Sequence, residues 1–397
     1  MTKPRFTLLF VLACAGCSRS LEPATAAGGH PPWSARAPEQ SAAELWGMHV
    51  LATHLVNPRG ILELSDGSLL VAEAGVGDPE NPNSGRVLRL VDENHDGDFD
   101  DPGERQNIAD RQPSVNILRR LAVNRDEVFG LADIEAGDGM ILATVADPTT
   151  GSQLLRLDKS PPQPFATTKD NANSIAWHPK LGRWYAVQSF ANTVIEIAPD
   201  GATRDVALIS ALESGQHSVP AALVVEPASG GLLVALFSGQ LGGDTAGSGV
   251  DFVRDSGKVV RVDPRSGKIE SVVEHLNAPT DLALVGRDLL VLELCRDFRD
   301  PVHTVEEAKT GVRHAGFERY SGRVLRIRLD SGQVSVIAKD LDLPTHLRVM
   351  HDGRLLVTEG MGTPGRVIPS PAGPIPLEGR LIEFSAPPKR LGPERLY

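Results

Sequence analysis

The chain has 397 residues, with 40 Lys and Arg against 51 Asp and Glu, and a formal net charge of −11 at pH 7. This acidic balance, without any cluster of basic residues, argues against a nucleic-acid partner. Only Cys295 lies outside the first 17 residues, so no internal disulfide is expected and the hydrophobic core must stabilise the fold.

The N-terminus has the features of an export signal. Two basic residues precede the apolar run 6–15, FTLLFVLACA, which as a helix would rise only about 15 Å and is too short to span a bilayer. An Ala-Gly pair then precedes Cys17, which resembles the lipobox of bacterial lipoproteins, with Cys14 as a rival acceptor. We therefore predict that residues 1–16 are removed, that Cys17 is acylated, and that the lipid alone anchors the protein on the periplasmic side of the cell envelope.

The next segment, 17–43, is rich in Ala, Pro, Gly and Ser and has no apolar period. Such a composition cannot bury enough surface to order itself, so we expect a flexible tether. The folded domain is predicted to span 44–386, followed by a C-terminal tail at 387–397. After the signal, the sequence has no uninterrupted run of eighteen apolar residues, so no membrane-spanning helix is predicted there.

An internal repeat dominates the domain. Three segments align closely, namely HLVNPRGI at 54–61, HLNAPTDL at 275–282 and DLDLPTHL at 340–347. Each of them is followed by a turn, a β-rich run containing Glu, and a further run that begins with Gly-Arg. Weaker copies fill the gaps. The six repeats begin near residues 58, 128, 172, 220, 279 and 344.

Each repeat holds three or four short strands rich in Val, Ile and Leu, separated by turn residues. A sheet of this size cannot cover its own faces, and such units bury them by packing radially as blades. The sequence therefore predicts an all-β, six-bladed β-propeller. The sixth repeat lacks a fourth strand, whereas 48–55 matches the fourth strands at 269–276 and 334–341. We predict that this N-terminal strand completes the last blade.

The connecting loops predict which face carries the site. With the strands of a blade named A to D from the axis outward, the B–C loops and the D–A links share one face. The tight A–B turns lie on the other face. The enlarged B–C loops are 75–84, 239–256, 295–321 and 361–378. Long loops on one side of a rigid scaffold commonly carry binding or catalytic residues, so we expect the site on the B–C face.

Aligned repeats place polar residues around the axis on this face. Our alignment puts Gly60, Gly130, Ser174, Ala222, Asp281 and His346 at one ring position. Asp281 and His346 open adjacent blades and can form an acid–base pair or part of a metal site, and Glu293 joins them as the third candidate catalytic residue. Ordinary solvated side chains are the alternative. The candidate ligand-binding residues on this face are Arg59, Glu73, Glu359, His217, Arg296, His303 and His314.

Glu73, Glu293 and Glu359 occupy identical places near the end of strand B. Carboxylates pointing together into the channel would repel one another, which would raise a pKa or recruit a cation. The alternative is that each glutamate bonds to backbone amides or to a neighbouring Arg. The sequence leaves both arrangements open.

An acidic loop in the first repeat resembles a calcium-binding loop. Oxygen-bearing side chains alternate along it, and a glycine stands sixth, as in loops of EF-hand type. Glu104 is thirteenth rather than twelfth, and no helices are expected to flank the loop. We predict a structural calcium site, with an unoccupied acidic turn as the alternative. The predicted ligands are Asp92, Asn94, Asp96, Asp98 and Asp100.

The repeat strings also carry a family resemblance. The segments 57–75, 219–239, 278–294 and 343–360 resemble the ScyD/ScyE family of exported six-bladed propellers. The resemblance covers 48–386 and is looser in blades two and three. It implies a TolB-like fold and an extracytoplasmic location, and it provides no catalytic residues to carry over.

This chain lacks the characteristic motifs of two families of propeller enzymes. Gluconolactonases of the SMP-30 type have a glutamate in an LGEGP-like strand A, where this chain has NPRG at 57–60. Soluble quinoprotein sugar dehydrogenases use a His in an H-G-G context, whereas His346 lies in Pro-Thr-His-Leu. A quinone is therefore not expected, although the scattered ligands of that cofactor leave the alternative open.

Two functional hypotheses follow. The first is a non-catalytic propeller that binds a small polar ligand, a glycan or an envelope protein on the B–C face. The second is a propeller enzyme, either a quinoprotein-like oxidoreductase or a metal-dependent hydrolase or lactonase, with its site at the channel mouth. The sequence does not decide between them and does not indicate the oligomeric state.

Overall fold

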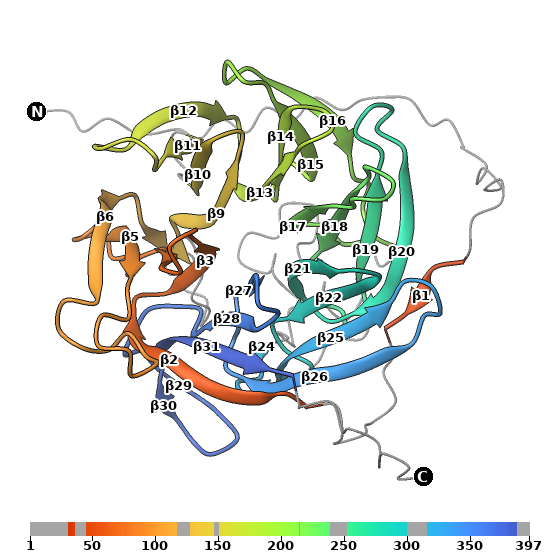
Figure 1. The fold of residues 1–397 in the computed structure, drawn as a ribbon. Helices are drawn as coiled ribbons and strands as arrows, with labels where there is room; N and C mark the ends of the chain where they lie inside the picture. Colours follow the sequence, from red (N-terminus) through yellow and green to blue (C-terminus); the bar gives the residue numbers. More distant parts are fainter. Residues whose placement is uncertain are drawn as a thin grey trace, which may run out of the picture. The chain divides into compact units, whose positions relative to one another are not determined.

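The computed structural model describes residues 31–35, 45–116, 128–146, 151–213, 215–238, 252–299 and 316–386. Within this part, six sheets follow one another in chain order around a central axis (Figure 1), each with four antiparallel strands, to which one sheet adds a fifth, parallel strand. The six-bladed β-propeller is thereby confirmed. Several predictions lie outside the described residues, namely those for 1–16, Cys17, His303, His314 and 387–397. Among the described residues, no helix is both long and apolar enough to cross a membrane.

The first three blades have the following strands, in order from the axis outward. Blade one contains β3 (Pro58–Glu63), β4 (Leu69–Glu73), β5 (Gly85–Leu90) and β6 (Arg105–Gln112). Blade two contains β9 (Leu131–Gly137), β10 (Met140–Val145), β11 (Ser152–Arg156) and β12 (Gln163–Thr168). Blade three contains β13 (Ala172–His178), β14 (Arg183–Gln188), β15 (Thr193–Ile197) and β16 (Thr203–Leu208).

The other three blades carry the longer B–C loops. Blade four contains β17 (Pro220–Val225), β18 (Leu232–Leu236), β19 (Gly257–Val262) and β20 (Ile269–Leu276). Blade five contains β21 (Pro279–Val285), β22 (Asp288–Glu293), β25 (Gly322–Arg328) and β26 (Val334–Leu341). Blade six contains β27 (His346–Val349), β28 (Leu355–Glu359), β31 (Gly379–Ser385) and β2 (Gly47–Leu55). Three small hairpins lie in the connections: β7 (Val115–Asn116) with β8 (Val128–Phe129), β23 (Phe298–Arg299) with β24 (Gly316–Phe317), and β29 (Val367–Ile368) with β30 (Ile375–Pro376).

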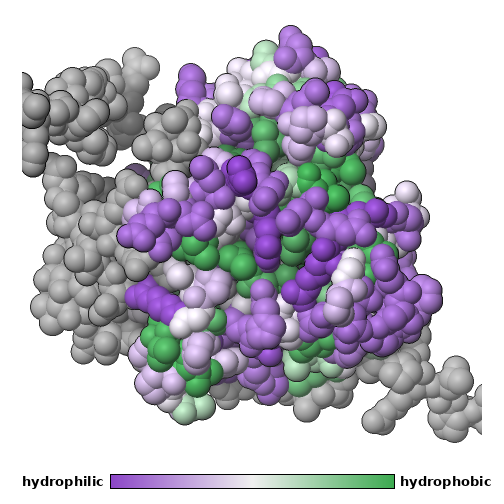
Figure 2. Space-filling model, turned by 90° about the vertical axis from the view of Figure 1, so that its left-hand side faces the viewer, coloured by the Kyte–Doolittle hydropathy of each residue, from purple (hydrophilic) through white to green (hydrophobic). Residues whose placement is uncertain are grey.

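The hydrophobic core lies between adjacent blades. Strands in position B are almost wholly buried, because a neighbouring blade covers each face, and they accordingly read as continuous apolar runs such as LLVAL in β18. One apolar cluster joins Leu62 and Ala72 of blade one to Ile134 and Ala143 of blade two. Outer strands such as β6 are largely exposed, and the surface seen from the side of β6 and β12 is predominantly hydrophilic (Figure 2).

The ring closes as the sequence predicts. Strand β2 pairs antiparallel with β31 in a register that runs from Gly47 opposite Ser385 to Leu55 opposite Gly379. Near the axis, the Thr345 hydroxyl donates to the Pro58 carbonyl at 2.7 Å. Blade six is therefore tied to the start of the chain at both its outer and its inner edge.

A short strand within the expected tether was not predicted. Strand β1 (Trp33–Ser34) pairs in parallel with the outer edge of β20, and Ala35 is fully buried between blades four and five. The Trp33 indole lies against Gly332, where a Cβ would come within 2.0 Å of the ring. The expectation of a flexible tether therefore does not hold for residues 33–35, because the edge of β20, the Gly332 turn and the apolar cluster around Ala35 provide contacts that composition alone does not reveal.

Candidate functional site

The D–A links of blades one, five and six share a backbone conformation on the B–C face. In each link, the first and fourth residues of the repeated segment have positive φ, so two left-handed residues enclose the amides between them. Left-handed conformations are uncommon outside glycine, which means that other contacts must hold these links in place. The residues and their φ values are His54 (56°), Asn57 (53°), His275 (63°), Ala278 (43°), Asp340 (60°) and Leu343 (52°).

The repeated glutamates provide those contacts. Glu293 is fully buried, accepts a hydrogen bond from the Asn277 amide at 2.7 Å, and pairs with Arg323 Nε at 2.5 Å. Glu73 and Glu359 make the equivalent contacts, with the Val56 and Asp342 amides and with Arg86 and Arg380. Burial raises the pKa of Glu293 and Glu359, which the adjacent arginines offset only in part. The structure therefore shows the second arrangement considered from the sequence, in which each glutamate binds an amide and an Arg.

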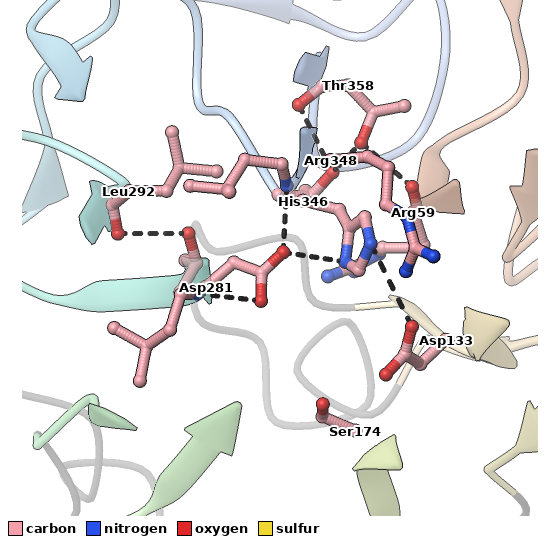
Figure 3. A network of polar contacts seen from close by, with 12 residues as sticks. Arg59, Asp133, Ser174, Asp281, Leu292, His346, Arg348 and Thr358 are labelled. Carbon is pink, nitrogen blue, oxygen red and sulfur yellow. Dashed lines mark hydrogen bonds and ion pairs between the residues drawn. The ribbon is translucent and has the colours of Figure 1, made fainter. Parts of the chain in front are cut away.

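The predicted pair of His346 and Asp281 is in contact at the axis. His346 Nδ1 lies 2.8 Å from Asp281 Oδ2, and Nε2 lies 3.9 Å from Asp133 Oδ1 (Figure 3). The imidazole thus stands between a carboxylate of blade five and a carboxylate of blade two. The side chains of His346, Asp281 and Asp133 are 13%, 6% and 5% exposed, so solvent reaches them poorly.

Asp133 corrects the sequence alignment of blade two. It stands beside Gly60, where a Cβ would lie 2.7 Å from the Asp133 Cα, so Asp133 occupies the ring position that the alignment gave to Gly130. Asp133 and Asp281 make the same contacts. Each accepts a hydrogen bond from the next amide in its own strand at 2.8 Å. The Asp-Ile dipeptide at 133–134, which resembles Asp-Leu at 281–282, is the sequence signal that was missed.

Both aspartates also join one blade to the next. Asp133 Oδ2 accepts from the Ile175 amide of blade three at 2.9 Å, and Asp281 Oδ2 accepts from the Leu347 amide of blade six at 2.8 Å. Burial raises the pKa of Asp133, against the favourable charge of His346. These carboxylates therefore serve as inter-blade links as well as partners of the histidine.

A second ion pair lies beside the first. Arg348 Nη1 is 2.6 Å from Glu135 Oε2, and these residues stand two positions beyond His346 and Asp133 on β27 and β9. Burial alone would lower the pKa of His346, but Asp281 and Asp133 raise it above its usual value. The channel thus holds an imidazole between two aspartate side chains that favour its protonated form, an arrangement suited to joining blades two, five and six.

Of the other predicted ligand residues, Arg59 belongs to the polar network around His346 (Figure 3), whereas Arg296 and His217 lie elsewhere. Arg59 Nη2 donates to the Val128 carbonyl at 3.2 Å. Arg296 is paired with Asp297 at 2.5 Å and its side chain is 54% exposed, whereas His217 contacts Asn192 in blade three. The structure therefore joins His346 to Asp281 but does not bring Glu293, Arg296 or His217 into that cluster.

An aromatic cluster at the described ends of the B–C loops of blades four and five was missed by the sequence analysis. Phe252 packs on Phe317 with ring centroids 4.6 Å apart and on Phe237 at 5.0 Å, and Phe298 lies beside them. These four residues come from the loops and loop ends of blades four and five. Because isolated phenylalanines in loops have no period, only the fold shows that they form a shared base for this face.

The acidic loop connects β5 and β6, as predicted, and is held by its own hydrogen bonds. Asp92 Oδ2 accepts from the Gly97 amide at 3.2 Å, and Asp100 accepts from the Thr53 amide of β2 at 2.9 Å. Across the described segments, no three acidic, His or Cys side chains form a group that could hold a metal ion. Asp92 Oδ1 is buried without a hydrogen-bond partner, which leaves one carboxylate oxygen of the kind calcium prefers. Calcium binding stays a prediction.

Comparison with known proteins supports the fold. No family model and no curated protein matches the chain. The PQQ-bound aldose sugar dehydrogenase from Streptomyces coelicolor is similar in structure, with 13% identity and a TM-score of 0.50 over 87% of this chain and 99% of that chain. A streptogramin B lyase has 11% identity and a TM-score of 0.45 over 88% and 100% of the two chains. A chain of the nidogen/laminin complex has 13% identity and a TM-score of 0.47 over 74% and 86%. At 13% identity, the likeness to the dehydrogenase shows a shared fold and no specific family.

Proposed function

We propose that this chain is an exported, lipid-anchored binding propeller of the ScyD/ScyE type that carries out no chemistry in its channel. It holds a small polar ligand, a glycan or an envelope protein on the B–C face. The observation that carries this proposal is the state of the channel residues: the His346 and Asp281 side chains are buried and bonded to each other and to neighbouring blades.

A general acid or base must reach the proton that it transfers in the bound substrate. Asp281 uses both carboxylate oxygens on backbone amides, at 2.8 Å each, and also binds His346. Glu293 is held by Arg323 and the Asn277 amide instead of joining the pair. These contacts favour a structural role for the three candidate catalytic residues.

The location of the apolar loop base supports binding on the B–C face. The cluster around Phe252 and Phe317 fixes the loop ends of blades four and five, and buried Arg319 joins blade five to blade six by pairing with Asp342 at 2.5 Å. Side chains that are already fixed in place lose less conformational entropy when a ligand binds. This face is therefore suited to recognition.

The enzyme alternative rests on one observation. His346 Nε2 is 3.9 Å from Asp133 Oδ1, beyond hydrogen-bonding distance. The test is to purify the protein from its envelope and to measure its metal content and its absorbance spectrum. A stoichiometric transition metal or quinone that is lost in His346→Ala would establish the enzyme. Calcium alone, or neither group, would support the binding propeller.

A further inference from the structure

A small hollow lies on the B–C face at blade three. It measures about 250 Å³, close to the lower end of the roughly 300–1,000 Å³ of ligand pockets. The B–C loop of blade three forms one wall, and the link from blade three to blade four forms the other. We call it the blade-three hollow, and it is lined by Asn192, Leu208, Ile209, Ser210, Ala211 and His217.

The polar groups of the hollow are fixed in orientation. Asn192 Oδ1 accepts hydrogen bonds from the Ser218 hydroxyl at 3.0 Å and from the Val219 amide at 2.9 Å. The amide nitrogen of Asn192 must then donate to His217 Nδ1, which is 3.2 Å away. The histidine therefore carries its ring proton on Nε2.

This Nε2–H group is a preset hydrogen-bond donor. Among the described residues, the contact with Asn192 is the one hydrogen bond of the His217 ring. The ring is half-buried, so the donor is held at the wall of the hollow without being sealed off. A ligand that brings an acceptor oxygen gains this hydrogen bond without having to reorder the protein.

An exposed apolar side chain lines the hollow together with this donor. Leu208 is 71% exposed, and Ile209 and Ala211 line the hollow with it. A ligand that covers Leu208 with an apolar face removes this apolar surface from water, which is favourable.

We propose that the blade-three hollow binds one neutral sugar ring of a glycan. None of its six lining residues is charged, which disfavours an ionic ligand. A pyranose ring has an apolar C–H face for Leu208, together with oxygen atoms that accept from His217 Nε2–H and from the Ser210 hydroxyl. The volume suits a single ring rather than a buried chain. This inference rests on the proposed function, since it names the ligand class of the same face.

The test uses the mature full-length lipoprotein in detergent on an array of neutral and anionic glycans. We expect binding to neutral glycans, and at least a tenfold weaker affinity in Leu208→Ala and in His217→Ala, with partial recovery in His217→Gln, which keeps an N–H donor. The matched controls are His351→Ala and Val285→Ala, an exposed histidine and an exposed apolar residue in A–B turns on the opposite face, and these should bind normally. Thermal melting confirms that each variant is folded.

Other outcomes separate the two proposals. Glycan binding that survives both hollow variants, or binding of anionic glycans or an envelope protein alone, would overturn the hollow and leave the binding propeller standing. Absence of any glycan binding would also overturn the hollow. A stoichiometric quinone or transition metal would instead overturn the proposed function.

Discussion

Replacing Glu293 tests whether it is a structural or a catalytic residue. Its side chain is fully buried, and Arg323, its partner, is only 14% exposed. Glu293→Ala would leave the guanidinium largely buried without a counter-charge and the Asn277 amide without its acceptor. Breaking a buried pair in this way costs about 3–5 kcal/mol, and an unsatisfied amide accounts for about 1–3 kcal/mol of such losses. We therefore expect the free energy of unfolding to fall by about 3–5 kcal/mol.

Two further variants sharpen the measurement. Glu293→Gln keeps an acceptor for Asn277, and because burial raises the pKa of Glu293, a neutral side chain is better tolerated there. We expect this variant to lose roughly 1.5–3 kcal/mol, the range for hydrogen bonds to charged groups. Asp352→Ala is the control, since Asp352 and its partner Arg354 are 52% and 43% exposed. Exposed pairs of this kind contribute about 0–1 kcal/mol.

Urea unfolding followed by tryptophan fluorescence measures these differences, and the fully buried Trp184 is a suitable reporter of the core. The slope of unfolding free energy against urea should stay constant, so that midpoints can be compared. A loss in Glu293→Ala no larger than in Asp352→Ala would refute the structural role. Loss of an activity at unchanged stability would restore the catalytic assignment.

Three other predictions follow from the site, the loop and the signal. Asp281 and Asp133 raise the pKa of His346 despite its burial. The stabilisation that comes from this histidine should therefore be complete below about pH 6.5 and decline as the pH rises through the raised pKa. Melting temperatures should accordingly fall toward alkaline pH in wild type, and much less in His346→Gln. EDTA should lower the melting temperature of wild type and leave Asp96→Ala unchanged, whereas identical melting of wild type with and without EDTA would count against calcium. Cys17→Ser should move the protein from the membrane fraction to the soluble periplasmic fraction. A variant that stays in the membrane fraction would count against Cys17 as the lipid site.

The repeat made the architecture accessible from sequence. The segments at 54–61, 275–282 and 340–347 recur with the same strands after them, and the fourth strand missing from the last repeat had a match at 48–55. Strand periodicity and turn residues are local properties, so they can be recognised without knowing what packs against them. The contact between Asp281 and His346 followed from the same alignment.

Several contacts required the fold. Asp133 was missed because the hairpin of β7 and β8 precedes blade two, and anchoring the alignment at Val128 shifted the ring position by three residues. Strand β1 has two residues and therefore no period to recognise. Its place depends on Gly332 and on the apolar side chains of blades four and five that bury Ala35, all of which are far from Trp33 in the sequence.

By itself, the sequence determined that the folded part is a ring of six small sheets, where every sheet except that of blade two begins, and which early segment closes the ring. Repeated hydrophobic patterns and turn residues are local properties of the chain and can be read without the fold. Only the tertiary structure decided which side chains meet at the axis, and that the repeated glutamates bind backbone amides and arginines. Those partners come from different blades, and their distances depend on how every blade packs against the next.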